Sequence, residues 1–181
     1  MNIALFGGSF DPFHMGHEAI IESLDKNLDI EEIFLVPTYL NPFKKSFHLQ
    51  AQDRLALLHE MYEDNAKIKI IDFEVKQERA VPTIETVEYL KSKYQLDTIY
   101  LVIGADNFLS IKSWNNYEKL SKSVRFVVIT RNGYTINSQD IKYIQMEVNV
   151  DVSSTQLREN LDLKYIPQKI KKRIQKLWKK E

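Results

Sequence analysis

The feature that most constrains the fold is that short apolar runs alternate with helical patterns along most of the chain. Ile3–Phe6, Ile33–Val36 and Ile99–Ile103 each have the length and unbroken apolar character of a buried strand. Between them, segments such as Gly16–Leu28 space apolar residues three and four positions apart, which indicates an amphipathic helix. This alternation predicts an α/β fold with a doubly wound parallel sheet flanked by helices. We expect one domain over residues 1–181.

The remaining patterns extend the same series. Further strands are predicted at Ile68–Val75, Val124–Ile129 and Tyr143–Val152. Further helices are predicted at Gln52–Glu63, at Thr83–Tyr94 with Thr83 as the N-cap after Pro82, at Ser154–Asn160 and at Pro167–Lys179. The last two form a helical extension from about residue 153, and Tyr39–Gln50 reads as a loop. Ligands of such sheets bind beyond the carboxyl ends of the strands, so we expect the strand tails to line one crevice.

Composition excludes several classes of protein. Lys plus Arg and Asp plus Glu both number 25, so no overall charge attracts nucleic acid or an anionic membrane. The absence of cysteine excludes disulfides, thiol catalysis, iron–sulfur clusters and cysteine zinc sites. Without a signal peptide or a long apolar span, we expect a cytoplasmic protein with no membrane partner. The basic residues of 164–180 are interpreted as the solvated face of the last helix, with nucleic-acid binding as the alternative.

Glycine and histidine, which are rare in this chain, are concentrated near the N-terminus. Gly7 and Gly8 directly follow the first predicted strand, where their backbone N–H groups can face a ligand. Gly16 opens the next helix, so His17 falls in a first helical turn, which favours anions, and His14 lies three residues earlier. Neither a dinucleotide fingerprint nor a Walker loop is present. Two alternatives for the histidines are metal binding, for which no third ligand stands nearby, and a purely structural role in capping and packing.

A second polar motif lies near the other end of the chain. In Val152–Arg158 a helix is predicted to begin at a cluster of hydroxyl residues. Ser154 and Thr155 are four and three residues before Arg158, so their hydroxyls and its guanidinium share one helix face. Hydroxyl donors beside a forked cation suit a triphosphate.

These two motifs resemble the signatures of the (H/T)xGH nucleotidyltransferase superfamily. Gly7–His17 matches the pattern Gly-Gly-x-Phe-Asp-Pro-x-His-x-Gly-His of bacterial nicotinate-nucleotide adenylyltransferases, and Val152–Arg158 resembles their Ile-Ser-Ser-Thr-x-x-Arg. The resemblance implies a Rossmann-like fold and adenylyl transfer from ATP to nicotinate mononucleotide in NAD biosynthesis, with Mg²⁺ carried by ATP. It implies that His14, His17 and Arg158 are catalytic. It implies ATP contacts from Gly7, Gly8, Ser9, Phe10, His14, His17, Gly104, Asp106, Arg131, Ser154, Thr155 and Arg158.

Four further residues are implied in binding the mononucleotide. Trp114, eight residues after Asp106, matches a tryptophan that stacks on the pyridine ring. Thr83 and Thr86 match threonines of the family's Arg-x-x-Pro-Ser-Tyr-Thr-x-x-Thr stretch, although Val81 and Pro82 replace the usual Ser-Tyr. Lys44 matches the lysine of a Pro-Pro-His-Lys loop in which Phe43 replaces the histidine.

Two parts of this interpretation have alternatives, namely the molecule that accepts the adenylyl group and whether the protein is an enzyme. The same chemistry on nicotinamide mononucleotide or another phosphorylated acceptor would use the same phosphate motifs. A non-catalytic nucleotide-binding regulator is the alternative from another class, although it need not keep His14, His17 and Arg158. The sequence leaves open whether the chain forms a homo-oligomer.

Overall fold

The strands form one parallel sheet. This computed structural model describes residues 1–40, 47–138 and 140–178. In that part of the chain the strands are β1 (Asn2–Gly8), β2 (Glu32–Pro37), β3 (Ile68–Ile70), β4 (Thr98–Gly104), β5 (Arg125–Thr130) and β6 (Tyr143–Glu147). Their order is β3-β2-β1-β4-β5-β6, and every neighbouring pair is parallel. The predicted doubly wound, Rossmann-like α/β domain is confirmed.

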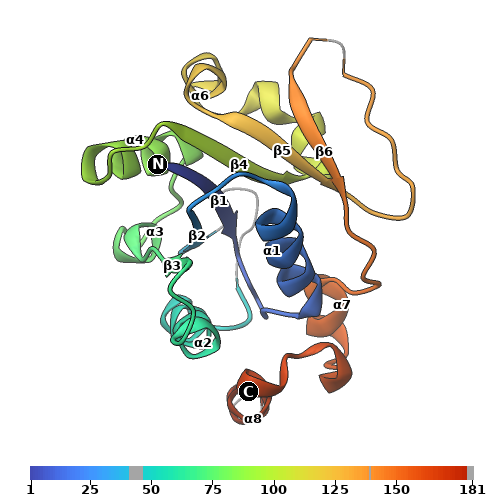
Figure 1. Ribbon diagram of the computed structural model, residues 1–181. Helices are drawn as coiled ribbons and strands as arrows, with labels where there is room; N and C mark the ends of the chain where they lie inside the picture. Colours follow the sequence, from blue (N-terminus) through green and yellow to red (C-terminus); the bar gives the residue numbers. More distant parts are fainter. Residues whose placement is uncertain (41–46, 139, 179–181) are drawn as a thin grey trace.

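The connections between the strands are mostly helical. The α-helices are α1 (Met15–Asn27), α2 (Ala51–Tyr62), α3 (Phe73–Lys76), α4 (Thr83–Lys93), α5 (Ala105–Leu109), α6 (Tyr117–Ser123), α7 (Ser154–Glu159) and α8 (Gln168–Trp178). Two short 3-10 helices lie at Ile111–Ser113 and Leu163–Tyr165. Figure 1 shows the sheet crossing the molecule, with α1, α7 and α8 on one side of it and α4 and α6 on the other.

Both faces of the sheet are buried, as continuous apolar strands require. Along β1, Ala4 and Phe6 face a core that includes side chains of α1, α2, α7 and α8. Ile3 and Leu5 face the opposite core, which includes side chains of α4, α5 and α6. The side chains of a strand alternate between its faces, so this central strand is apolar at nearly every position.

Three expectations about local structure need correction, and two short helices were not expected. The strand predicted at Ile68–Val75 ends at Ile70, because the chain leaves the edge of the sheet and forms the single turn α3. The strand predicted at Tyr143–Val152 ends at Glu147. Thr83 is the first residue of α4 rather than its N-cap, since Pro82 is the capping residue. The helices α5 and α6 were not predicted, because they are too short to show apolar periodicity.

The strand order reverses direction between β1 and β4. A chain that winds outwards from its two central strands leaves a crevice beyond their carboxyl ends, where no crossover helix covers the sheet. Gly7 and Gly8 end β1, and Gly104 ends β4. The topology therefore places the N-terminal glycine–histidine segment at the usual ligand position of such sheets.

Candidate active site

The turn after β1 carries a strained residue. Phe10 has φ 48°, in the left-handed region that non-glycine residues rarely adopt. Its ring is 1% exposed and packs on the rings of Phe6, Phe13 and His17. A Cβ on Gly8 would lie 3.1 Å from the Phe10 ring, so glycine lets this ring fold back against the strand end. The side chain of Phe10 is thus a core group, and only its backbone can face a ligand.

His14 and His17 form a reciprocal capping arrangement at the start of α1. The Gly16 N–H donates to Nδ1 of His14 at 3.1 Å, and the His14 N–H donates to Nδ1 of His17 at 3.2 Å. The two rings stack with their centroids 3.8 Å apart. Because each Nδ1 accepts a hydrogen bond, the proton of each neutral ring is assigned to Nε2. Both imidazoles therefore offer an Nε2–H donor.

Both rings are neutral at physiological pH. Burial, assisted by the positive charge of Arg131, lowers the pKa of His14 to about 4. Burial, together with His14 and Arg131, lowers the pKa of His17 well below its usual value. A neutral Nε2–H stabilises a developing negative charge as a hydrogen-bond donor, without the cost of desolvating an imidazolium.

Gly16 is required by the position of the His14 ring. A Cβ at residue 16 would lie 2.9 Å from Cε1 and from Nδ1 of His14, and 3.3 Å from a methyl group of Val152. Contacts below 3.0 Å force a neighbour to move. The absence of a side chain at residue 16 therefore lets the helix begin directly beside the imidazole.

The second motif lies against this turn. Nη1 of Arg158 donates to the Asp11 carbonyl at 2.7 Å, and Nη2 donates to Thr155 Oγ1 at 2.9 Å. Ser154 Oγ donates to the Pro12 carbonyl at 3.1 Å. Figure 1 shows α7 beside the beginning of α1, although more than a hundred residues separate them in the sequence. The two ends of the chain thus build one polar cluster.

Arg131 adds a second guanidinium from the end of β5. Its Nη1 donates to the Val152 carbonyl at 2.7 Å, which links β5 to the segment before α7. Its charge lowers the pKa of both imidazoles, so it lies within electrostatic range of them. Two guanidinium groups and two neutral imidazoles at one sheet edge favour an anion with several oxygen atoms.

The predicted site residues at the end of β4 and in the segment after it lie across the switch point from this cluster. Gly104 and Asp106 are exposed, and a Cβ on Gly104 would meet nothing within 4 Å. No contact within the described chain therefore requires glycine at residue 104. Trp114 packs its ring against the core on the α4 side of the sheet. Ligand contacts at these positions stay predictions.

The two threonines differ in accessibility. Thr83 is half-buried in the first turn of α4. Thr86 is 1% exposed, and its hydroxyl donates to Glu74 Oε1 at 2.6 Å. Burial raises the pKa of Glu74 to about 7, against the effect of the Thr86 hydrogen bond. Direct binding by Thr86 would require this buried bond to rearrange. Lys44 lies outside the described residues.

Sequence reasoning assigned no role in the site to three polar residues that shape it. Asp11 is 2% exposed, and its carboxylate accepts from the N–H groups of His48 and Leu49, both at 2.8 Å. Arg54 is 1% exposed, and its guanidinium donates to backbone carbonyls. Glu74 lies beneath Thr86. Arg54 and Glu74 lie among apolar residues of predicted elements, where a charged residue is unusual. This break in the apolar pattern is the sequence feature that could have indicated them.

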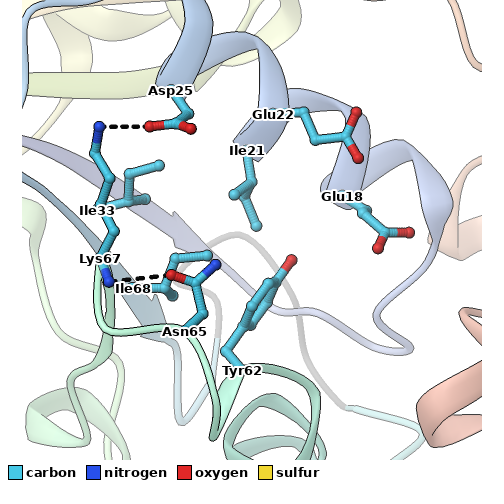
Figure 2. A pocket seen from close by; sticks show the side chains of 9 residues that line it. All are labelled: Glu18, Ile21, Glu22, Asp25, Ile33, Tyr62, Asn65, Lys67 and Ile68. Carbon is cyan, nitrogen blue, oxygen red and sulfur yellow. Dashed lines mark hydrogen bonds and ion pairs between the residues drawn. The ribbon is translucent and has the colours of Figure 1, made fainter.

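A separate hollow lies between α1, α2 and β3. It has a volume of about 230 Å³ and is lined by Glu18, Glu22, Asp25, Tyr62 and Lys67, among others. Figure 2 shows Asp25 paired with Lys67 and the Tyr62 hydroxyl pointing toward α1. None of the predicted site residues lines it, and it is smaller than pockets that enclose drug-sized ligands.

The described residues contain neither a metal-binding cluster nor a membrane-spanning helix. Within residues 1–40, 47–138 and 140–178, no group of three or more His, Cys, Asp or Glu side chains is arranged to hold a metal ion. In the same ranges, no helix has the length and apolar character needed to cross a bilayer.

Comparison with known proteins places this chain among transferases. A cytidylyltransferase-like family model matches residues 5–160. A protein of Sulfurimonas denitrificans that carries the name "Probable nicotinate-nucleotide adenylyltransferase" is 47% identical over 99% of this chain and 96% of its own length. A protein of the same name from Aliarcobacter butzleri is 44% identical over 96% and 95%.

A solved structure has the same fold. The nicotinic acid mononucleotide adenylyltransferase of Plasmodium falciparum, complexed with NaAD, superposes with a TM-score of 0.73 at 26% identity. The superposition covers 97% of this chain and 95% of that one.

Proposed function

The chain belongs to the nicotinate-nucleotide adenylyltransferase family of cytidylyltransferase-like proteins, and we propose that it converts ATP and nicotinate mononucleotide into nicotinate adenine dinucleotide (deamido-NAD) and pyrophosphate. This reaction is a step of NAD biosynthesis. The observation that carries the proposal is the joining of His14, His17 and Arg158 in one cluster at the switch point of the sheet.

The reaction needs positioned donors rather than covalent catalysis by the protein. A phosphate oxygen of the mononucleotide attacks the α-phosphorus of ATP in line, and the bond to the bridging oxygen breaks as pyrophosphate leaves. Negative charge builds on the α-phosphoryl oxygens and on the leaving group. The Nε2–H groups of His14 and His17 and the guanidinium of Arg158 are the donors we assign to that charge.

The remaining ATP contacts follow from the sheet edge. We assign the backbone of Gly7–Phe10 to the phosphates, together with Ser154, Thr155 and Arg131. Gly104 and Asp106, exposed at the end of β4, are assigned to the adenosine. An added Cβ at Gly104 would occupy open space, which a closely approaching ligand would need.

Mg²⁺ enters as part of the ATP substrate. The cluster offers guanidinium and imidazole N–H donors, which bind phosphate oxygens and do not coordinate a hard cation. We therefore assign the ion to the ATP phosphates, with no protein side chain as its resident ligand.

The acceptor contacts are the second part of the proposal. Thr83, Thr86, Trp114 and Lys44 are assigned to nicotinate mononucleotide by their match to the family pattern. Nicotinamide mononucleotide and other phosphorylated acceptors are the alternatives that an acceptor panel distinguishes.

The His17→Ala variant tests the assignment of the site. Loss of one preorganised donor should lower kcat by about 10²–10³ while the circular dichroism spectrum stays that of the wild type. Lys172→Ala, an exposed change on α8, is the matched control and should keep wild-type turnover. Near-normal turnover in folded His17→Ala would refute the site.

A further inference from the structure

Arg54 has the largest side chain among those that are almost completely buried, and the proposed chemistry does not use it. It lies on α2 and is 1% exposed. Its Nη1 donates to the carbonyls of Ser9 and Thr38, both at 2.7 Å. Its Nη2 donates to the Tyr39 carbonyl at 2.8 Å, and its Nε donates to the Leu49 carbonyl at 3.0 Å. One side chain thus joins the end of β1 to the segments on both sides of the 41–46 stretch.

These bonds hold the strained part of the Ser9–His17 turn, which we call the phosphate turn. Phe10, with φ 48°, is flanked by Ser9, whose carbonyl Arg54 holds, and by Asp11. The Asp11 carboxylate accepts the N–H groups of His48 and Leu49, so both neighbours of Phe10 are fixed to the same segment. A residue in a sparsely populated conformation persists where the surrounding contacts over-determine it.

The conformation of the turn determines where the candidate catalytic groups lie. The Asp11 carbonyl is the partner of Arg158, and the Pro12 carbonyl is the partner of Ser154. His14 caps α1 two residues further on. A shift at Ser9–Asp11 would therefore move the imidazole pair relative to Arg158.

We propose that Arg54 is a positioning residue for adenylyl transfer, which holds the Ser9–His17 turn through the Ser9 carbonyl and contacts no substrate. The inference rests on the proposed function. Lysine cannot replace arginine here, because a single ammonium cannot reach four carbonyls that a planar guanidinium spans.

The test compares Arg54→Lys with the wild type by amide hydrogen exchange and by steady-state kinetics. We expect exchange at residues 9–17 to become about tenfold faster, with β5 unchanged, because Ser9 loses its anchor. We expect kcat per folded molecule to fall about 10- to 100-fold with less than threefold change in KM for ATP, since misplacement of about 1 Å has costs of this size. Arg173→Lys, an exposed change on α8, is the control.

Two further variants separate positioning from general stability. Arg54→Lys combined with His17→Ala should lose about as much turnover as His17→Ala alone, because both changes disable the same group. Arg54→Ala should regain turnover on addition of guanidinium ion, even if Arg54→Lys folds poorly. Unchanged exchange at the turn, fully additive losses or no rescue would each overturn the inference. Inactivity of the wild type would instead refute the proposed function, and the exchange measurement would still decide the role of Arg54.

Discussion

At the scale of single residues, the site depends on which side chains are absent as much as on which are present. The His14 ring occupies the space that a Cβ at residue 16 would need, and the Phe10 ring lies against Gly8. Gly8 and Gly16 thus have the same effect, because each lets an aromatic ring lie close to the backbone.

The Gly16→Ala variant tests this steric argument. Alanine favours a helix over glycine by about 1 kcal/mol, which offsets the cost of displacing the His14 ring, so the free energy of unfolding should change little. The new Cβ would lie 2.9 Å from the His14 ring, which must move, and we expect kcat to fall at least about tenfold. Glu22→Ala, an exposed change on the same helix, should leave kcat unchanged. Wild-type turnover in Gly16→Ala would contradict the proposed position of His14.

The Glu74→Gln variant tests the buried carboxyl beneath Thr86. Burial raises the pKa of Glu74 to about 7 from its usual value of 4.5, so the folded state holds the proton where the unfolded state has already lost it. Stability is therefore lost as the pH rises from 4.5 to about 7, and the loss is complete at higher pH. Glutamine can still accept the Thr86 hydrogen bond. We expect its urea-derived free energy of unfolding to exceed that of the wild type by about 1–3 kcal/mol at pH 8, and by much less near pH 5.

The variant and the wild type are compared at the same pH, because His14 changes the stability of both proteins in the opposite direction to Glu74. Its pKa is lowered to about 4, so its protonation costs stability as the pH falls from 6.5 towards 4. Glu78→Gln, at an exposed carboxylate, is the control. A gain from Glu74→Gln that is independent of pH would contradict the raised pKa.

The role of a residue could be predicted from the sequence when its interaction partners lie nearby in the sequence. His14 and His17 were recognisable because capping needs only a local spacing. Arg54 was not assigned a role, because its carbonyl partners lie up to 45 residues away. The Glu74–Thr86 bond likewise depends on how α3 packs beside α4, which no local pattern specifies.

At the scale of elements, α8 is attached to α2 by two kinds of contact. Ile170 and Ile174 are completely buried, while Lys169 and Arg173 pair with acidic residues of the α2 region at the surface. The Trp178 ring at its end packs against the His48 ring in a tilted arrangement, with ring centroids 4.0 Å apart. The His48 N–H in turn donates to Asp11, so the last helix contacts the support of the phosphate turn.

The apolar contacts should dominate this attachment. Ile174→Ala should lower the free energy of unfolding by about 2–4 kcal/mol, because it leaves a cavity in a closed core. Arg173→Ala should cost less than about 1 kcal/mol, since the ion pair with Glu60 is exposed to solvent. Urea denaturation of both variants measures the difference, and equal losses would contradict the packing described here.

Long periodic elements could be predicted, and short ones could not. The strands β1, β2, β4 and β5 and the helices α1, α2 and α4 matched their expected ranges to within about two residues. The single turn α3 and the five-residue α5 are fixed by the packing of the residues around them, so their sequences carry little periodic signal.

At the scale of the whole molecule, an evenly charged chain concentrates cationic groups at one sheet edge. Lys plus Arg balance Asp plus Glu, yet the charge of Arg131 acts on the histidine pair, and Arg158 binds the Asp11 carbonyl of the same turn after β1. The strand order places the turn after β1 at the switch point, and the segment from Val152 to Arg158 reaches it from the chain after β6. The family and its fold could be predicted from two motifs, whereas the supports of the site required the tertiary structure.

The most direct test is formation of the dinucleotide by the purified chain. Wild-type protein is incubated with ATP, Mg²⁺ and either nicotinate or nicotinamide mononucleotide, and pyrophosphate and dinucleotide are measured together. We expect both products in equal amounts, with kcat/KM at least about tenfold higher for the nicotinate form, since a site built for a carboxylate leaves its donors unpaired by an amide. Absence of pyrophosphate release with every acceptor, or preference for the amide, would contradict the central claim.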